Sequence, residues 1–247
     1  MGPVVSFVVT GAGSGIGREI AARLARTAHV VVLDPARGPA WDLERVHVLE
    51  GDAGDPATAL AAAQQAESHA PLTGWVNNAA VFHDTTLADA EAADVLGMIT
   101  ANLRLAVVGC HVAVNHLLRH RRPGALVNVS SHQAQRPVRG ALPYATAKAA
   151  LEGLTRAVAV DHGPDGIRAN AVALGSIATA RYEQYRAAHP DVDAHMAALH
   201  PLGGIGQPGD VADAVEFLLS EHARHITGAV LPVDGGRSVL GLDPEAV

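Results

Sequence analysis

Residues 4–17, VVSFVVTGAGSGIG, join an apolar run to a cluster of glycines. Residues 4–9 are rich in β-branched side chains and almost continuously apolar, which is typical of a strand buried on both faces of a parallel sheet. After the glycines, Ile16, Ile20 and Leu24 recur at helical spacing. The stretch therefore predicts a strand, a tight turn and a helix in direct succession.

The glycine turn has a physical use at this place in the chain. Glycines allow a tight turn and let a pyrophosphate approach main-chain N–H groups at a helix N-terminus, where the dipole favours negative charge. Such turns are common, but the position between a strand and a helix makes phosphate binding the preferred interpretation. The candidate cofactor contacts in this turn are Gly11, Gly13, Ser14, Gly15, Ile16 and Gly17.

A second strand is predicted at residues 30–33 and leads to Asp34. A carboxylate at this place can accept hydrogen bonds from both hydroxyls of an adenosine ribose and would repel a 2′-phosphate, so Asp34 favours NAD over NADP. Arg18 and Arg37 are the opposing features, and both are interpreted as solvated surface arginines. Few residues separate Asp34 from the third strand at 46–49, so the helix between the two strands is expected to be short or absent.

Further candidate contacts follow the next two strands. Asp52 and Ala53 precede an alanine-rich helix expected at about residues 56–69. The Asp52 carboxylate could meet an adenine amino group or could cap that helix. A fourth strand ends in Asn77 and Asn78, whose amides suit backbone tethering or cofactor lining, or could be plain turn residues.

A long helix is expected at about residues 87–120 and contains Asn102. It is apolar on more than one face, which indicates burial against a partner as well as in the core. His116 and His120 lie four residues apart in this helix and are interpreted as surface histidines, because no third ligand accompanies them. The 14 histidines form no Cys/His cluster along the sequence, so no catalytic metal is predicted.

Tyr144 and Lys148 lie in another predicted helix, after a strand at 125–129 that delivers Ser131 at its carboxyl end. At a spacing of four residues both side chains share one helix face. An ammonium within ~4–6 Å can lower a phenol pKa by roughly 1–3 units, toward the range that suits a general acid–base. Lys148 is the only lysine among the 18 basic residues, consistent with a need for a compact ammonium.

The remaining pattern predicts strands at 167–172 and within 229–236, with an amphipathic helix at 211–219 between them. Residues 180–207 are interpreted as a mobile helical insertion beside the carboxyl edge of the predicted sheet. A substrate lid is expected at this place. No linker, charge block or repeat interrupts the chain, so a single domain spanning residues 1–247 is expected.

Composition excludes several classes of function. The formal charge of −7, the pI near 6.0 and the 3% aromatic content argue against nucleic acid as a partner. No apolar run approaches the ~20 residues that a membrane span needs, and no secretory signal is evident, so no membrane partner is expected. The single cysteine excludes an internal disulfide and fits a reducing compartment. A cytoplasmic protein is predicted.

Over almost its whole length, the chain resembles a single-domain short-chain dehydrogenase/reductase. The motifs that carry the resemblance are Thr10-Gly-x-x-x-Gly15-Ile-Gly17, Asp52, Asn77-Asn78-Ala79, Asn102, Ser131, Tyr144-x-x-x-Lys148, the segment 170–179 and Val233-Asp-Gly-Gly236. The family implies a Rossmann-type doubly wound parallel sheet flanked by helices on both faces, assembled as a homodimer or homotetramer. Its members move a hydride between a nicotinamide and a carbonyl or secondary alcohol.

The resemblance also implies roles for four residues. Tyr144 would be the general acid–base, and Ser131 would hydrogen-bond the substrate oxygen. Lys148 would hold the nicotinamide ribose and lower the tyrosine pKa, while Asn102 would position a water that links Lys148 to solvent. The further cofactor contacts are Asp34, Asp52, Ala53, Asn78, Ala79, Ala80, Tyr144, Lys148, Gly175, Ile177 and Thr179.

Substrate contacts are the least determined part of the site. The candidates are His83, His132, Gln133, Pro143 and Ser176, each of which could instead be loop structure. Ala80 and Leu174 replace a Gly and a Pro that the family often has, which puts family-typical substrate contacts in doubt but not the reaction class.

Two hypotheses of different class follow. The first is an oxidoreductase that uses NAD in preference to NADP. Within it, a 3-oxoacyl-thioester reductase competes with a polyol, sugar or hydroxy-acid dehydrogenase, and Asp34 favours NAD and hence alcohol oxidation. The second is a non-catalytic dinucleotide-binding regulator, which would have no need for the complete set of Asn102, Ser131, Tyr144 and Lys148.

Overall fold

The computed structural model describes residues 4–241, and its strands form one parallel sheet in the order β3-β2-β1-β4-β5-β6-β7. The strands are β1 (Ser6–Thr10), β2 (His29–Asp34), β3 (Val46–Glu50), β4 (Leu72–Asn77), β5 (Gly124–Ser131), β6 (Ile167–Leu174) and β7 (Val230–Val233). The order reverses between β1 and β4, so the predicted doubly wound Rossmann-type sheet is confirmed.

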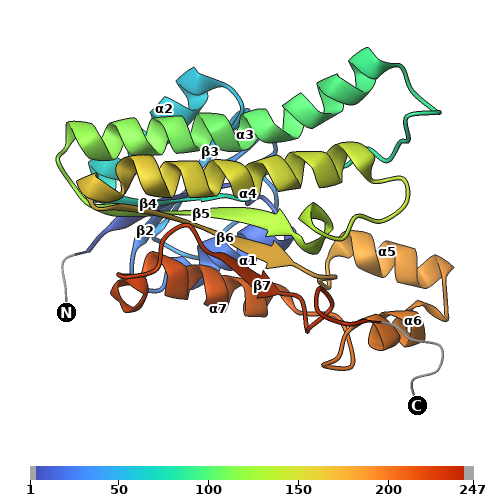
Figure 1. Ribbon diagram of the computed structural model, residues 1–247. Coiled ribbons are helices and arrows are strands. Elements are labelled where there is room, and N and C mark those ends of the chain that lie inside the picture. The colour runs from blue at the N-terminus through green and yellow to red at the C-terminus, as the bar shows by residue number, and fades with distance from the viewer. Residues whose placement is uncertain (1–3, 242–247) are drawn as a thin grey trace.

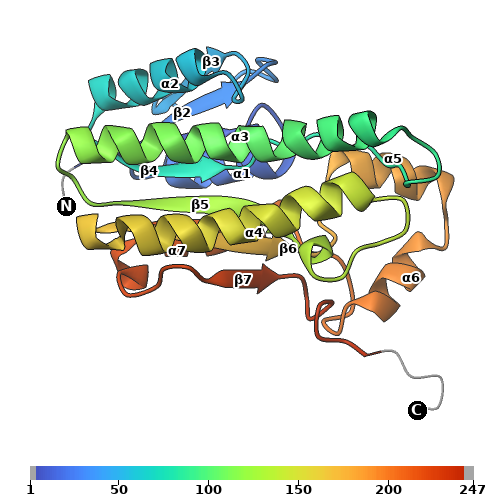
Figure 2. The same ribbon diagram turned by 45° about the horizontal axis from the view of Figure 1, so that its top comes forward.

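Helices cover both faces of this sheet (Figures 1 and 2). They are α1 (Gly15–Leu24), α2 (Pro56–His69), α3 (Ala92–Arg119), α4 (Leu142–His162), α5 (Ala180–Ala188), α6 (Val192–Leu199) and α7 (Pro208–Leu219). Helices α2, α3 and α4 pack on one face and α1 and α7 on the other, while α5 and α6 lie beyond the carboxyl ends of the strands.

The first two strands show why their sequences are apolar at almost every position. Val8 and Val31 enter the core beneath α2 and α3, whereas Val9, Val30 and Val32 enter the core above α1 and α7. Successive side chains of a strand point to opposite faces, and here both faces are buried. As predicted, no helix connects β2 to β3 in the described chain.

Two predicted boundaries were wrong by a few residues. Strand β1 begins at Ser6, where its pairing with β2 and β4 starts, and not at residue 4. Helix α3 begins at Ala92, and not at 87. Before it, the Thr86 hydroxyl bonds the Asp89 carboxylate and accepts a hydrogen bond from the Ala88 N–H, and such local bonds compete with a helix.

Helix α3 also corrects the expectation that no apolar run approaches a membrane span. It is long and apolar enough to cross a membrane by length and composition alone. In the fold it lies along the sheet between α2 and α4 (Figure 2). Its buried side chains, among them Val112, Val114 and Leu117, belong to the core beneath it, whereas Leu96, Val107 and Leu118 are exposed.

The interpretation of His116 as a surface histidine was wrong, because α3 packs against α2 at this point. His116 is buried, and its Nε2 lies 3.0 Å from Oε2 of Glu67 on α2. Glu67 also accepts two hydrogen bonds from Arg122, at 2.8 and 3.0 Å, and one from the Leu72 N–H. Arg122, His116 and Leu72 together hold the Glu67 pKa far below its usual range.

Candidate active site

The strands of the sheet end at one edge, and the candidate residues follow these ends (Figure 1). The glycine turn follows β1, Asp34 ends β2, and Ser131 ends β5. In doubly wound sheets this carboxyl edge, at the point where the strand order reverses, is where ligands bind. The fold thus brings together groups that are far apart in the sequence.

Asn78 fixes the glycine turn against β4. Its Nδ2 donates to the carbonyl oxygens of Thr10, at 3.1 Å, and Gly11, at 2.7 Å, and the Asn78 N–H donates to the Thr10 hydroxyl. Gly11 has a φ of +64°, and a Cβ there would lie 2.6 Å from the Cα of Ala79. The backbone-tethering interpretation of Asn78 is therefore confirmed, and the turn needs glycine at this position.

The turn leaves room for an anion at the start of α1. In the part of the chain that the structure describes, no side chain caps the first turn of this helix, and the turn itself contains no acidic residue. Gly15 has a φ of +56°, with no other atom within 4 Å of the place where its Cβ would lie. Free N–H groups at a helix N-terminus beside open space fit the pyrophosphate of a dinucleotide.

Asp34 lies against this turn at the end of β2. Its Oδ2 accepts a hydrogen bond from the Gly13 N–H at 2.9 Å, and its Oδ1 accepts one from the Ala36 N–H at 3.0 Å. A Cβ on Gly13 would lie 3.0 Å from the Asp34 carboxyl carbon, so the close approach depends on glycine. The structure places a negative charge where the sequence predicted it.

Arg18 is not the solvated surface arginine that the sequence indicated. Its guanidinium donates to the carbonyl oxygens of Pro39, at 2.9 Å, and Ala40, at 2.8 Å, and lies 3.9 Å from the centroid of the Trp41 ring. The connector between β2 and β3 folds back over α1 and supplies these partners. Arg37, in contrast, is 82% exposed, as expected.

Asp52 does not cap α2, because Asp55 occupies the cap position and accepts hydrogen bonds from the Ala57 and Thr58 N–H groups. The Asp52 carboxylate instead accepts from the Gly54 N–H at 2.7 Å and pairs with Arg104 at 3.0 Å. It remains half exposed at the carboxyl edge. Its predicted contact with adenine stays a prediction, as does the predicted cofactor contact of the buried Ala53.

Ser131, Tyr144 and Lys148 converge where β5 ends and α4 begins. Tyr144 lies in the first turn of α4, and its hydroxyl interacts with the Ser131 side chain. Lys148 is buried one turn later, with Nζ donating to the Val129 carbonyl oxygen at 2.6 Å and lying 5.4 Å from the centroid of the Tyr144 ring. The shared helix face that the spacing predicted is confirmed.

The expected effect of Lys148 on the tyrosine is not observed in this structure. Burial raises the pKa of Tyr144 to about 12, against smaller opposing effects of Ser131 and Arg181. Burial likewise lowers the pKa of Lys148 to about 8. The Lys148 ammonium bonds Val129 and does not contact the phenol oxygen, so desolvation of the charged forms outweighs their attraction.

Asn102 is buried in α3 and bonds the loop that follows β4. Its Oδ1 accepts from the Val81 N–H at 3.0 Å, and its Nδ2 donates to the Val81 carbonyl oxygen at 2.9 Å. These two bonds fix the segment that carries Ala79, Ala80 and Phe82. The structure thus shows Asn102 in a positioning contact, whereas the implied water link to Lys148 stays a prediction.

Two side chains at the site, those of Phe82 and Arg181, were not predicted from the sequence. The Phe82 ring stacks on Tyr144, with centroids 4.9 Å apart and planes inclined by 29°. The Arg181 guanidinium, from the start of α5, lies 4.5 Å from the centroid of the Phe82 ring. No spacing links these residues to Tyr144, because each comes from a different element.

His132 and Gln133 follow Ser131 in a short 3₁₀ turn, η1 (His132–Ala134). His132 Nδ1 lies 3.2 Å from the Leu174 carbonyl oxygen, so Nδ1 carries the proton in the neutral ring and Nε2 is an acceptor. Burial and the nearby Arg237 lower the His132 pKa. Within residues 4–241, His132 Nε2 and Gln133 Oε1 are buried without a hydrogen-bond partner.

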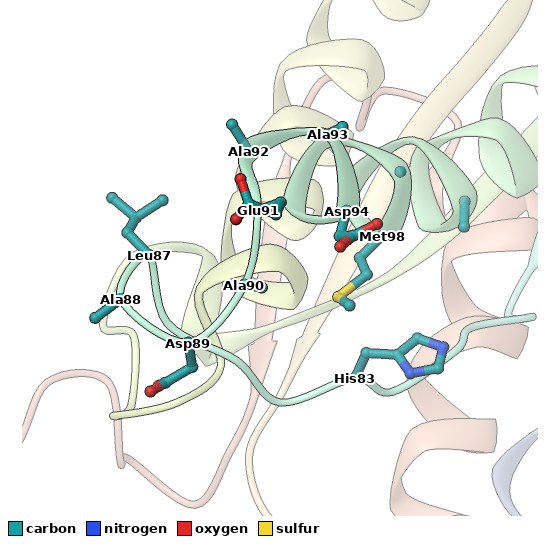
Figure 3. Close-up of a pocket in the computed structure, with 12 residues that line it drawn as sticks. His83, Leu87, Ala88, Asp89, Ala90, Glu91, Ala92, Ala93, Asp94 and Met98 are labelled. Carbon is teal, nitrogen blue, oxygen red and sulfur yellow. The ribbon is translucent and has the colours of Figure 1, made fainter.

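The other substrate candidates have different surroundings. The Ser176 hydroxyl accepts a hydrogen bond from Arg237 at 2.7 Å, and Pro143 is buried in the first turn of α4. His83 lines an open hollow of about 900 Å³, where the Met98 side chain extends toward it from α3 (Figure 3). Tyr144 does not line that hollow, so the hollow lies outside the convergence of Ser131, Tyr144 and Lys148.

The predicted cofactor contacts after β6 join the strand to the helices beyond it. The Gly175 N–H donates to the Val233 carbonyl oxygen at 3.0 Å, and a Cβ there would lie 2.7 Å from the Cα of Asp234. Ile177 is buried and bridges to Gly206, and Thr179 caps α5. Their contact with a cofactor stays a prediction.

Comparison with known proteins agrees with this architecture. A family model described as enoyl-(acyl carrier protein) reductase matches residues 11–238. The 2-(S)-hydroxypropyl-CoM dehydrogenase 3 of Xanthobacter autotrophicus (strain ATCC BAA-1158 / Py2) is 32% identical, covering 95% of this chain and 96% of the relative. Among solved structures, the ligand-free aldohexose dehydrogenase of Thermoplasma acidophilum superposes with a TM-score of 0.88 at 28% identity, covering 99% of this chain and 97% of that one. ElxO with NADP bound gives a TM-score of 0.85 at 26% identity, covering 95% and 98%.

These matches span nearly the whole chain and confirm the resemblance that the motifs carried. They favour an enzyme over the alternative of a non-catalytic dinucleotide-binding regulator. The chain belongs to the short-chain dehydrogenase/reductase family and is an oxidoreductase acting on CH–OH groups with NAD or NADP.

Proposed function

We propose that this protein is a dehydrogenase that prefers NAD and acts on a small hydroxylated substrate, with Tyr144 as its general acid–base. The observation that carries the proposal is the meeting of Tyr144, Ser131 and the sole lysine at the edge of the sheet that also holds the glycine turn. The open start of α1 and the Asp34 carboxylate fit the pyrophosphate and the adenosine ribose of a dinucleotide.

Each side chain has a defined task in this proposal. A bound nicotinamide supplies the hydride chemistry. In the oxidation direction Tyr144 acts as the phenolate, whose oxygen accepts the proton of the substrate hydroxyl, and in reduction it acts as the neutral phenol, which donates its proton to the carbonyl oxygen. Ser131 donates a hydrogen bond to the same substrate oxygen and stabilises the charge that develops there.

Lys148 and Asn102 support this chemistry by positioning the cofactor and the loop after β4. The Lys148 ammonium has three donors, of which one is used by the Val129 carbonyl oxygen. The other two have no acceptor among residues 4–241 and would donate to the hydroxyls of the nicotinamide ribose. Asn102 fixes the segment after β4 through Val81, and it would also position the water that links Lys148 to solvent.

The preference for NAD rests on the charges beside the glycine turn. The Asp34 carboxylate already lies 2.9 Å from the Gly13 N–H and would repel a 2′-phosphate. Arg18, one of the two arginines considered for neutralising such a phosphate, already donates to the carbonyl oxygens of Pro39 and Ala40. ElxO binds NADP, so the preference in this chain depends on these residues and not on the fold.

The proposed substrate is a polyol, a sugar or a hydroxy acid. Its support is the pair of unpartnered buried acceptors, His132 Nε2 and Gln133 Oε1, next to Ser131. A buried acceptor is stabilised by a donor, and additional hydroxyls of a polar substrate supply donors, whereas an acyl chain does not. The aldohexose dehydrogenase that superposes on this chain acts on such a molecule.

The lid and the assembly stay predictions. Arg181, at the start of α5 within the expected lid at about 180–207, lies over the Phe82 ring, which stacks on Tyr144. A single domain over residues 1–247, a cytoplasmic location and a homodimer or homotetramer are also expected. Light scattering of the purified protein tests the assembly.

A panel of substrates tests the proposal. Polyols, aldoses, hydroxy acids and 3-oxoacyl thioesters are assayed with NAD(H) and NADP(H), with the Tyr144→Phe variant as the control for background turnover. We expect the highest kcat/KM with NAD and a hydroxylated substrate. A higher kcat/KM with a 3-oxoacyl thioester would instead favour the thioester reductase.

Tyr144→Phe tests the general acid–base itself. Removal of the phenol oxygen should lower kcat by roughly 10²–10⁴-fold, while NADH binding followed by fluorescence stays within about twofold of the wild type. Turnover close to that of the wild type would remove Tyr144 from this role, whichever substrate the panel identifies.

A further inference from the structure

Three histidines from different elements meet at the amino end of the sheet, away from the site described above. His29 begins β2, His47 lies early in β3, and His69 ends α2. One ring nitrogen of each histidine lies within 4.8 Å of one ring nitrogen of each of the other two. Nothing in their spacing along the chain predicts this meeting, because parallel pairing of β2 with β3 and the packing of α2 bring them together.

The rings pack closely. His29 Nδ1 lies 3.1 Å from His47 Nε2, and the His47 and His69 rings stack with centroids 3.5 Å apart and planes inclined by 6°. The third pair, His29 and His69, has centroids 5.4 Å apart. Two nitrogen ligands of one tetrahedral zinc ion lie about 3.3 Å apart, given Zn–N distances of about 2.0–2.1 Å, so the first pair already has that spacing.

The charges around the cluster favour neutral rings. Burial lowers the pKa of both His29 and His47, and each is lowered further by the neighbouring histidines. Arg45 contributes in the same direction at His29. The histidine–carboxylate pairs of the described residues involve other histidines, namely His116, His120 and His162.

We propose that His29, His47 and His69 form a binding site for one divalent transition-metal ion of the Zn²⁺ type, separate from the catalytic site. Neutral imidazoles are preferred ligands of zinc, nickel and copper, and three of them leave one coordination position for water. His69 is exposed and His29 and His47 are half-buried, so an ion can reach the cluster from solvent. Because the His47 and His69 rings are parallel, the exposed His69 ring must rotate out of the stack for its nitrogen to reach the ion.

A second group of possible ligands, Glu67, His116 and His120, does not form such a site. The Glu67 carboxylate already accepts hydrogen bonds from Arg122, His116 and the Leu72 N–H. A cation would have to displace the Arg122 guanidinium. This group therefore serves as an internal control for the first.

A bound ion would add a side-chain link between three elements, one of which is the edge strand of the sheet. Strand β3 is the edge of the sheet, every one of its residues is at least partly exposed, and no helix links it to β2. An ion held by His29, His47 and His69 would connect this edge strand to β2 and to α2. Because a ligand that binds the folded state stabilises it, Zn²⁺ should raise the midpoint of thermal unfolding.

Titration of the purified, tag-free chain with Zn²⁺, by calorimetry at pH 7.5, tests the site. We expect one ion per chain in the wild type. In His47→Ala and His69→Ala the affinity should fall by more than the roughly 10–100-fold that loss of an outer-shell partner costs. His120→Ala is the matched control and should bind as the wild type does.

Two further measurements separate loss of the metal site from loss of the fold. Far-UV circular dichroism without metal checks that each variant is folded, and Co²⁺ in place of Zn²⁺ gives visible absorption bands that report imidazole ligands directly. Equal affinity in the wild type, His47→Ala and His69→Ala would overturn the proposal. Absence of saturable binding to the wild type, or loss of binding in His120→Ala alone, would overturn it as well.

Discussion

At the carboxyl end of the sheet, charged side chains bond to the backbone, whereas at the amino end three histidines contact one another. Lys148 donates to the Val129 carbonyl oxygen, and Asp34 accepts from the Gly13 and Ala36 N–H groups. Within residues 4–241, the ring nitrogens of His29, His47 and His69 have no such partner beyond the contact between His29 and His47. At the carboxyl end, backbone bonds therefore hold the side chains in place without a bound molecule. At the amino end, the histidine nitrogens remain available to bind an ion.

This difference separates activity from stability. Catalytic groups must be held near their productive geometry, and backbone partners achieve this without mobile counter-ions. The amino end holds no group of the proposed reaction. The Glu67–Arg122 ion pair and the three histidines there can therefore affect the unfolding free energy without affecting turnover. Changes at the carboxyl end should therefore alter turnover, and changes at the amino end should alter unfolding.

Lys148→Arg is the strongest test of the carboxyl end. The longer, planar guanidinium cannot reproduce the 2.6 Å bond to Val129 within the same buried space, although it keeps the charge. We expect kcat/KM to fall by roughly 100-fold, as for loss of a group that supports acid–base catalysis. Steady-state kinetics measures this effect, and circular dichroism confirms the fold. Unchanged kinetics would contradict the importance of a compact ammonium.

Glu67→Gln is the corresponding test of the amino end. Glu67 and Arg122 are each 23% exposed and joined by two hydrogen bonds, and His116 would lose its charged partner too. The unfolding free energy at pH 7 should fall by about 2 kcal/mol, the scale of a hydrogen bond to a charged group. Denaturant titration gives this value, and kcat/KM should stay within about twofold. A large loss of activity would break the proposed separation.

The same pair predicts a pH dependence. The Glu67 pKa is depressed in the folded state relative to its ordinary value of 4.5, so its stabilising effect is complete above 4.5. As the pH falls below 4.5, the unfolded state takes up the proton first and this contribution is lost. The difference in unfolding free energy between wild type and Glu67→Gln should therefore shrink as acid is added. A difference that stays constant down to pH 3 would contradict it.

Asp34→Asn should have a smaller effect, confined to cofactor choice. Removal of the carboxylate charge should lower the ratio of kcat/KM for NAD to that for NADP by about tenfold, or ~1.4 kcal/mol. Glu50→Gln is the matched control, because Glu50 is the cross-strand neighbour of Asp34 on β3. An unchanged ratio in Asp34→Asn, or an equal change in Glu50→Gln, would count against the assignment.

Arg18→Ala should have the smallest effect. The Arg18 guanidinium holds the β2–β3 connector through Pro39, Ala40 and the Trp41 ring. Its loss should cost about 0.5–1 kcal/mol of unfolding free energy, the scale of an exposed cation–π contact. Thermal unfolding measures this cost. If NADP affinity fell together with stability, Arg18 would contact the 2′-phosphate after all.

The accuracy of the sequence predictions depended on whether a feature was local. The spacing of Tyr144 and Lys148 and the apolar run of β1 were predicted well, since helical and strand periodicity fix them. The pKa of Tyr144 was expected to fall and instead rises, because burial depends on what packs above the ring. The stacking of Phe82 on Tyr144 and the position of Arg181 over Phe82 were not predicted, because these contacts also depend on how separate elements pack.

By itself, the sequence determined the Rossmann-type sheet, the glycine turn and the family, because these rest on short-range patterns and on motifs in a fixed order. The tertiary structure decided which groups meet. It buried His116 against Glu67, committed Arg18 to the β2–β3 connector, and gathered His29, His47 and His69 at the amino end. The physical reason is that strand pairing and helix packing set these contacts, and neither leaves a periodic signal in the chain.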